Sequence, residues 1–421
     1  MTVTTGDVKR EKAVIVGIEL AGDEPAETAY SLDELAGLAD TAGAEVVGRL
    51  TQKKARPDPA TFLGSGKAGE VAELCRQLEA ELVIFDRELS PRQGRNLEEL
   101  LGVRVVDRTQ LILDIFAGRA RTSEGKLQVE LAQLNYLLPR LVGKGLELSR
   151  LGGGIGTRGP GETKLEVDRR RIRQRIADLK EELKNVKKHR DLLRRSRQEA
   201  PIPLVALVGY TNAGKSTILK KLTGAQVLVE DKLFATLDPT TRRVVLPNNE
   251  AVLLTDTVGF IQRLPHHLVA AFRATLEEVV EADILLHVVD ASHPNSDAQV
   301  EAVNRVLETL GAADKPVIIV NNKIDLVEQE ALPRKSDDPP AVFVSAVSGQ
   351  GLEDLLAAVA QILSDRRLRA NFFIPYEKSS VLALLHEKGR VLKEEHGQEG
   401  ISVEAEIEAV WAKRAEARLR E

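Results

Sequence analysis

The sequence predicts an α/β protein built in four parts. A small parallel α/β domain comes first, an antiparallel helical hairpin second, a doubly wound sheet third and a small α+β domain last. Three observations predict this class: short β-branched runs alternate with helix-length segments in two regions, two heptad patterns flank a glycine-rich stretch, and one apolar strand leads into a glycine-rich loop and a helix. We place the four parts at residues 1–115, 116–200, 201–369 and 370–421.

Composition excludes several classes of protein. The chain has 421 residues, 43% hydrophobic and 29% charged, which is typical of a globular protein, and its net charge of −5 excludes a general polycation. Cys75 is the only cysteine, so an intramolecular disulfide and a cysteine-cluster zinc site are excluded. The first apolar run, Ala13–Leu20, is too short for a signal peptide, and no run approaches the roughly 18 apolar residues of a membrane span. We expect a cytoplasmic monomer without a membrane anchor.

The first part alternates strand and helix patterns. Strand-like and helix-like runs follow one another at residues 14–18, 31–42, 45–50, 69–80, 82–86 and 103–107. This alternation predicts a parallel sheet. Within it, Phe62-Leu-Gly-Ser-Gly-Lys67 superficially resembles a phosphate loop, but Thr61 stands where the first glycine is needed and Ala68 follows the lysine. We interpret it as a strand-to-helix turn, with a second nucleotide site as the alternative.

The second part has the pattern of two long helices. Leucines are spaced 4, 3, 4 and 3 apart at positions 127, 131, 134, 138 and 141, and a second apolar seam runs from Leu165 to Leu193. The glycine-rich residues 142–163 between them cannot continue either helix. An antiparallel hairpin with a mobile tip is predicted.

The last two parts return to mixed patterns. Pro201 and Pro203 end the second helix, and strand-like runs then recur at residues 204–208, 252–255, 284–289, 317–320 and 341–344. The tail after Phe372 has two strand-like pieces around helical stretches at 379–395 and 405–420. It predicts a small α+β domain with no chemistry that we can identify.

The strand at 204–208 runs directly into a phosphate-binding loop. Glycines allow backbone N–H groups to surround phosphates, and the following helix presents its positive end. Lys215 is expected on the β- and γ-phosphates and Ser216 on Mg²⁺. The predicted phosphate-binding residues are Gly209, Tyr210, Thr211, Asn212, Ala213, Gly214, Lys215, Ser216 and Thr217.

Three later loops complete a predicted nucleotide site. Asp256 ends an apolar strand and suits Mg²⁺, and the N–H of Gly259 can meet a γ-phosphate. Asp325 can accept hydrogen bonds from both N1–H and the exocyclic amine of guanine, which selects GTP over ATP. The expected contacts in these loops are Asp256, Thr257, Val258, Gly259, Asn322, Lys323, Ile324, Asp325, Ser345 and Ala346.

Together these elements resemble a translation-factor-class P-loop GTPase. Asp231-Lys-Leu-Phe-Ala-Thr-Leu-Asp238 and the flanking middle part narrow the resemblance to the HflX family of ribosome-associated GTPases, over nearly the whole chain. The resemblance implies a first switch that also contacts GTP, at Phe234, Ala235, Thr236, Leu237 and Asp238. It makes Thr236 the protein ligand of Mg²⁺ beside Ser216 and Asp256, a choice that the residues alone leave open among three threonines. Lys215, Thr236 and Gly259 are then the expected catalytic residues.

The hydrolytic step is expected to be slow without a partner. Many GTPases place a water-orienting Gln directly after the Asp-x-x-Gly element, and here that position is Phe260. A partner or a reordered switch must supply the missing stabilisation. Asn212 either helps to bind K⁺ in place of an arginine finger, as in some GTPases that lack the Gln, or caps the loop.

The second hairpin helix carries a basic stripe. Residues 164–197 contain fourteen Lys or Arg against six Asp or Glu, a local excess of eight positive charges. This excess favours contact with a nucleic-acid backbone over a solvated helix face. The resemblance implies that the hairpin reaches the peptidyl-transferase region of the large ribosomal subunit. The expected contacts with its rRNA are Arg150, Arg158, Lys164, Arg169, Arg170, Arg171 and Arg173.

We therefore predict a Mg²⁺-dependent GTPase that binds the large (50S) ribosomal subunit in its GTP form and leaves after hydrolysis. The resemblance adds the purpose, which is splitting or rescuing stalled or stressed ribosomes. Two alternatives stay open at this point. One is a GTPase that assembles large subunits, and the other is an RNA-remodelling module that the GTPase part only regulates.

Overall fold

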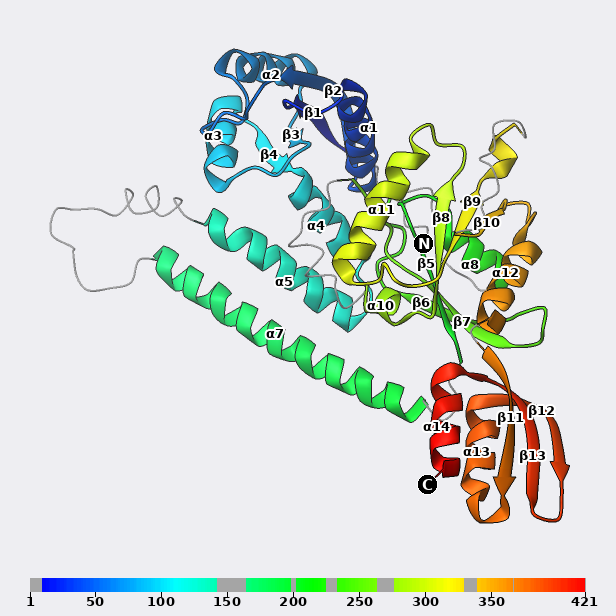
Figure 1. Ribbon diagram of the computed structural model, residues 1–421. Coiled ribbons are helices and arrows are strands. Elements are labelled where there is room, and N and C mark those ends of the chain that lie inside the picture. The colour runs from blue at the N-terminus through cyan, green and yellow to red at the C-terminus, as the bar shows by residue number, and fades with distance from the viewer. Residues whose placement is uncertain are drawn as a thin grey trace, which may run out of the picture. The chain divides into compact units, whose positions relative to one another are not determined.

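The computed structural model describes residues 10–141, 164–197, 202–224, 233–262, 276–328, 339–365 and 367–420 (Figure 1). The chain divides into two compact units. The first comprises residues 1–186, 229–238 and 258–275, and the second comprises residues 187–228, 239–257 and 276–421. The four-part division expected from the sequence stays a prediction.

The first unit contains a parallel four-stranded sheet in the order β2-β1-β3-β4. Its strands are β1 (Glu11–Glu19), β2 (Ala44–Lys53), β3 (Leu82–Phe85) and β4 (Arg104–Asp107), and its helices are α1 (Pro25–Thr41), α2 (Ser65–Leu78), α3 (Pro91–Leu101) and α4 (Arg108–Arg119). The predicted parallel sheet is confirmed, although α1 begins six residues before the expected helix and neither α3 nor α4 was expected.

The glycine-rich Phe62–Lys67 segment forms a turn into α2. Phe62 and Leu63 are buried in the core of the sheet, and Gly64 precedes the first turn of α2. The Nζ atom of Lys67 donates to Glu70 at 2.7 Å, so its ammonium is paired within its own helix. These contacts are those of a strand-to-helix connection.

Two long helices follow, α5 (Ser123–Arg140) and α7 (Lys164–Arg197). An Arg175–Glu130 ion pair joins them, with N–O distances of 2.7 and 2.8 Å, and Ile176 and Leu179 are buried on α7. The expected leucine seam of α5 is only half-buried, whereas a neighbouring stripe of Gly125, Gln128, Val129, Ala132 and Tyr136 is fully buried. This stripe lies on the side of α5 that packs against α3 and α4.

The second unit contains a six-stranded mixed sheet in the order β10-β9-β8-β5-β7-β6. Its strands are β5 (Leu204–Gly209), β6 (Thr240–Val245), β7 (Ala251–Asp256), β8 (Ile284–Asp290), β9 (Val317–Asn322) and β10 (Ala341–Phe343), and its helices are α8 (Lys215–Thr223), α10 (Glu277–Glu281), α11 (Ser296–Leu310) and α12 (Leu352–Asp365). Strands lie on both sides of β5, with β7 and β6 on one side and β8, β9 and β10 on the other, which confirms a doubly wound sheet with its switch point at β5. Strand β6, antiparallel to β7, was not expected.

The C-terminal part has three strands where two strand-like pieces were expected, and two of its helix ends also differ from the expectation. It has three antiparallel strands, β11 (Arg367–Pro375), β12 (Gly389–His396) and β13 (Gly400–Glu408), with helices α13 (Ser379–Lys388) and α14 (Ala409–Arg420). The helix expected to reach residue 395 therefore ends at Lys388, and the helix expected from residue 405 begins at Ala409. The physical reason is strand pairing, because residues 389–408 form a hairpin of β12 and β13 that buries Val403, Ala405 and Ile407.

None of the helices in the described ranges is both long enough and apolar enough to span a membrane.

Candidate nucleotide-binding site

The phosphate-binding loop joins β5 to α8 at the switch point of the sheet. Gly209 has φ +149° and Gly214 has φ +97°. A Cβ atom at Gly209 would lie 2.3 Å from the carbonyl oxygen of Val288, and one at Gly214 would lie 2.1 Å from Nδ2 of Asn322. Both positions therefore require glycine, for backbone conformation and for space.

Lys215 is held at the loop by its own backbone. Its Nζ atom donates to the carbonyl oxygens of Gly209 at 3.1 Å and of Tyr210 at 2.7 Å, and the side chain is buried. Burial lowers the pKa of Lys215 to about 8, and the charge of Asp256 partly opposes that shift. The ammonium thus stays beside the first residues of α8, at the helix end that favours anions.

Ser216 and Asp256 bring two oxygen ligands together. The Ser216 Oγ atom donates to Oδ2 of Asp256 at 2.5 Å, and Asp256 is fully buried at the end of β7, in register with Leu207 of β5. The following residue, Thr257, is held in place because its hydroxyl donates to the carbonyl oxygen of Leu207 at 2.7 Å. A hydroxyl and a carboxylate are hard oxygen ligands, so these two residues fit Mg²⁺.

One asparagine ties three loops together at the other end of the site. The Nδ2 atom of Asn322 donates to the carbonyl oxygen of Ala213 at 2.8 Å, and its Oδ1 atom accepts from the N–H of Ala346 at 3.0 Å. The next residue, Lys323, has φ +64° and pairs through Nζ with Asp290 at 2.6 Å. The structure thus brings the predicted loops at 209–217, 322–325 and 345–346 together around Asn322.

Asp325 lies on a short 3₁₀ helix, Ile324–Leu326, directly after Lys323. Its side chain is exposed, in contrast to the buried Asn322 and Ser345. The carboxylate therefore stands at the carboxyl edge of the sheet, where ligands of open α/β sheets bind.

Two residues of the site were missed by sequence reasoning. His287 of β8 is buried opposite Val208, and burial together with the nearby charge of Lys215 lowers its pKa to about 4, so the imidazole is neutral. Asp290 is the ion-pair partner of Lys323. The apolar run around His287 predicts only a strand. The position of Asp290 at the carboxyl end of a strand was a signal that could have identified it as a residue of the site.

The expected switch residues divide between the two units. Leu233–Asp238 and Val258–Ile261 are described with the first unit, and Asp256 and Thr257 with the second. Phe260, at the position where a water-orienting Gln was sought, is only 2% exposed. Its ring is therefore packed in the protein interior.

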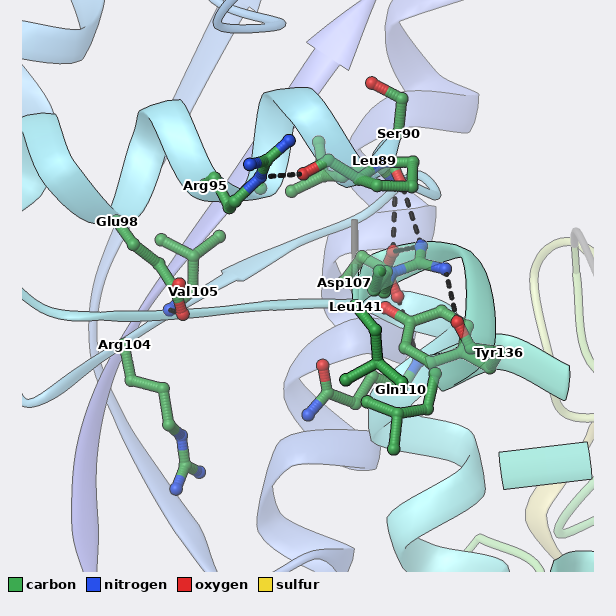
Figure 2. Close-up of a pocket in the computed structure, with 14 residues that line it drawn as sticks. Leu89, Ser90, Arg95, Glu98, Arg104, Val105, Asp107, Gln110, Tyr136 and Leu141 are labelled. Carbon is green, nitrogen blue, oxygen red and sulfur yellow. Dashed lines mark hydrogen bonds and ion pairs between the residues drawn. The ribbon is translucent and has the colours of Figure 1, made fainter. Parts of the chain in front are cut away.

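A cavity in the first unit is lined by residues of α3, β4 and α5 (Figure 2). Arg140 is one of its lining residues, and its guanidinium lies 3.4 Å from the centre of the Tyr136 ring. The Nη2 atom of Arg140 donates to the carbonyl oxygen of Leu89 at 2.7 Å and to Asp107 at 3.2 Å. These contacts hold α5 against the sheet.

The basic surface of α7 is described in part. Arg170, Arg171 and Arg173 are exposed, and Arg169 is half-buried. Arg150 and Arg158 lie outside the described residues, as does the side chain of Lys164.

Comparison with known proteins identifies relatives over most of the chain. Family models match residues 29–117 (GTP-binding GTPase N-terminal), 119–197 (GTP-binding GTPase Middle Region), 204–323 (50S ribosome-binding GTPase) and 331–420 (HflX C-terminal domain). The chain is 54% identical to the GTPase HflX of Caldanaerobacter subterraneus subsp. tengcongensis, over 94% of this chain and 91% of that protein. It is 46% identical to the GTPase HflX of Escherichia coli K12, over 93% and 92% of the two chains.

Among solved structures, the chain is similar to a GTP-binding protein from the hyperthermophilic archaeon Sulfolobus solfataricus in complex with GDP. The TM-score is 0.45 at 24% identity, and the match covers 84% of this chain and 99% of that one.

Proposed function

Because the chain belongs to the HflX family of GTPases, we propose that it binds the large ribosomal subunit in its GTP form, splits stalled or stressed ribosomes, and leaves after hydrolysing GTP. The enzyme hydrolyses GTP to GDP and phosphate, and residues 204–323 match a model of 50S ribosome-binding GTPases. The single observation that carries the ribosomal part is this match, and the charge on α7 described below supports it. Large subunits are cytoplasmic, so the proposal implies that this protein acts there.

The proposed roles at the site are those expected from its motifs and from the family resemblance. Lys215 binds the β- and γ-phosphates, the N–H of Gly259 binds the γ-phosphate, and Asp325 accepts hydrogen bonds from guanine. Ser216, Asp256 and Thr236 would hold Mg²⁺, which neutralises charge that develops on the phosphate oxygens during transfer. The direct Ser216–Asp256 hydrogen bond supports the first two of these ligands.

The buried Phe260 supports a need for an external activator. A phenyl ring cannot orient the attacking water by hydrogen bonding, and a ring that is 2% exposed cannot be displaced without opening the core. An activating contact is worth about 10³–10⁵ in rate. The ribosome is the proposed source of that contact.

Charge on α7 supports contact with phosphates. Arg175 and Lys187 are engaged by carboxylates, at 2.7 and 2.6 Å. Four further exposed basic residues have no ion pair within the described part of the chain: Arg173, Lys180, Lys184 and Lys188. A helix face stabilised by internal ion pairs would have engaged them, so their charge is available to a polyanion.

The proposal is tested by GTP turnover with and without purified large subunits, alongside light scattering of intact ribosomes. We expect stimulation of turnover by about 10³-fold or more and a loss of scattering that a non-hydrolysable GTP analogue also produces. Stimulation without loss of scattering would favour an assembly GTPase. RNA binding that ignores the nucleotide would favour an RNA-remodelling module, and either result overturns the splitting function.

A charge variant of α7 tests the surface separately. The variant replaces four residues by alanine at once: Arg173, Lys180, Lys184 and Lys188. We expect weaker binding to large subunits. We also expect the slope of log affinity against log salt concentration to fall by about one unit for each lost phosphate contact. The matched control removes the same charge from exposed positions elsewhere in the first unit: Arg56, Arg76, Arg92 and Lys126. Equal effects of the two sets would show a general charge effect and sink the α7 contact.

The role of Asn212 is tested by the cation dependence of GTP turnover. It has φ +61° within the phosphate-binding loop, a conformation for which asparagine is well suited. If Asn212 helps to hold K⁺, replacing K⁺ by Na⁺ at constant ionic strength lowers turnover and Asn212→Ala removes the difference. If it only caps the loop, the two cations give the same rate.

A further inference from the structure

The segment Leu233–Asp238, proposed above as the first switch, is attached to the helices of the first unit. The Oδ2 atom of Asp238 accepts hydrogen bonds from the backbone N–H groups of Arg121, at 2.8 Å, and Thr122, at 2.9 Å. Its Oδ1 atom accepts from the hydroxyl of Thr122. One carboxylate therefore receives three hydrogen bonds from two consecutive residues.

Thr122 links this carboxylate to the start of α5. Its Oγ atom accepts from the N–H of Gly125 at 3.0 Å, which caps the helix, while its hydroxyl proton is donated to Asp238. A helix N-terminus favours a negative charge, so Asp238 and α5 stabilise each other. A Cβ atom at Gly125 would lie 2.5 Å from Oδ1 of Asp238, so the carboxylate is closely packed against the first turn.

A second anchor lies four residues earlier. Phe234 is 2% exposed, and its ring lies edge-on to that of Phe116 in α4, with ring centres 4.6 Å apart. Phe234 has φ +56°, which is unfavourable for a bulky side chain and persists only where the surroundings hold it. The packing of Phe116 supplies that restraint.

Thr236 lies between these two anchors, two residues from each. A residue held on both sides within five positions cannot move far without moving what holds it. The proposed Mg²⁺ ligand is therefore mechanically part of the first unit, whereas Ser216 and Asp256 belong to the second.

We propose that Thr122 and Phe116 are positioning residues for the first switch. Through their contacts, the position of the first unit depends on whether GDP or GTP is bound. When the switch moves so that Thr236 takes part in GTP binding, the Asp238–Thr122 and Phe234–Phe116 contacts move the N-terminal sheet and the hairpin with it. This inference rests on the proposed switch and on GTP-dependent docking, but its test requires no ribosome. If GTP changes the affinity of the first unit for a partner by some factor, linkage requires that this partner changes the affinity for GTP by the same factor.

The test measures the distance between the two units in the full chain by pulsed electron spin resonance. Cys75→Ala removes the only native thiol, and spin labels are placed at the exposed positions Glu99→Cys on α3 and Asn304→Cys on α11. We expect the distance distribution to differ between GDP and a non-hydrolysable GTP analogue. Binding of a fluorescent GTP analogue to the same labelled protein reports the nucleotide site independently.

The anchors are then broken one at a time. Thr122→Val removes the hydroxyl, and Phe116→Leu removes the ring contact. Each is expected to reduce the nucleotide-dependent change in distance by more than half, and Thr122→Ser is expected to restore it. Ser90→Ala is the matched control, because Ser90 caps α3 in the same unit through Gln93 without touching the switch segment.

The outcomes separate this proposal from the GTPase assignment. If the protein binds the nucleotide but the distance does not depend on it, the coupling is absent and the proposal is overturned. A change that persists in both anchor variants overturns it as well, as does an equal reduction in Ser90→Ala, which would indicate general destabilisation. Failure to bind the fluorescent analogue would instead contradict the nucleotide site itself.

Discussion

Asp325→Asn is expected to transfer the nucleotide preference from GTP to xanthosine triphosphate. The carboxylate accepts two hydrogen bonds from guanine in the proposed complex, and hydrogen bonds to charged groups contribute about 1.5–3 kcal/mol each. Affinity for GTP should therefore fall by about 10²–10⁴-fold. Xanthine has a carbonyl where guanine has an amine, and the amide N–H of asparagine can donate to it.

Competition binding with both nucleotides measures the change. Asp314→Asn, at an exposed position between α11 and β9, serves as the control and should leave both affinities unchanged. An equal loss for the two nucleotides would mean that the substitution disturbs the loop, and that Asp325 does not read the base.

The second large effect is expected in the core of the first unit, at Arg108. This arginine is 2% exposed and forms ion pairs with Asp86 at 2.8 Å and with Glu34 at 3.1 Å, both of which are buried. Arg108→Met removes the positive charge that pairs with these two buried carboxylates. We expect the unit to lose about 3–5 kcal/mol of its free energy of unfolding, because an uncompensated buried charge is costly.

Hydrogen exchange of β3, which leads directly to Asp86, measures this loss, since the single tryptophan, Trp411, lies in the C-terminal part and does not report on it. Adding Asp86→Leu and Glu34→Leu to Arg108→Met should recover most of the stability. Arg104→Met, which breaks an exposed pair with Glu11, should cost about 1 kcal/mol or less. Comparable losses at Arg104 and Arg108 would contradict the role of burial.

Sequence reasoning succeeded where a pattern is local. The strand, glycine loop and helix around Lys215 are contiguous, and two of the glycines have the steric requirement that the motif implies. The alternation of strands and helices likewise predicted both parallel arrangements, because a parallel connection needs a crossover of helix length.

Sequence reasoning failed where contacts with residues distant in the sequence determine the local structure. Strand β6 begins with Thr-Thr-Arg-Arg, which has no apolar alternation, and forms only because β7 offers an unpaired edge. Residues 389–395 have a helical composition but pair with β13. The buried stripe of α5 lies beside the leucines and includes the polar Gln128, because packing against α3 and α4 decides which side of the helix is buried.

The sequence by itself therefore determined the class of fold, the family and the residues proposed to bind GTP, since motifs of chemistry occupy short contiguous stretches. Only the tertiary structure decided that Arg108 closes a buried ion cluster, that Asn322 ties three loops together and that Asp238 binds Thr122, the residue that caps α5. Asp238 lies 116 residues beyond Thr122 in the chain. Hydrogen bonds over such separations depend on how the elements pack, and no local pattern of residues encodes them.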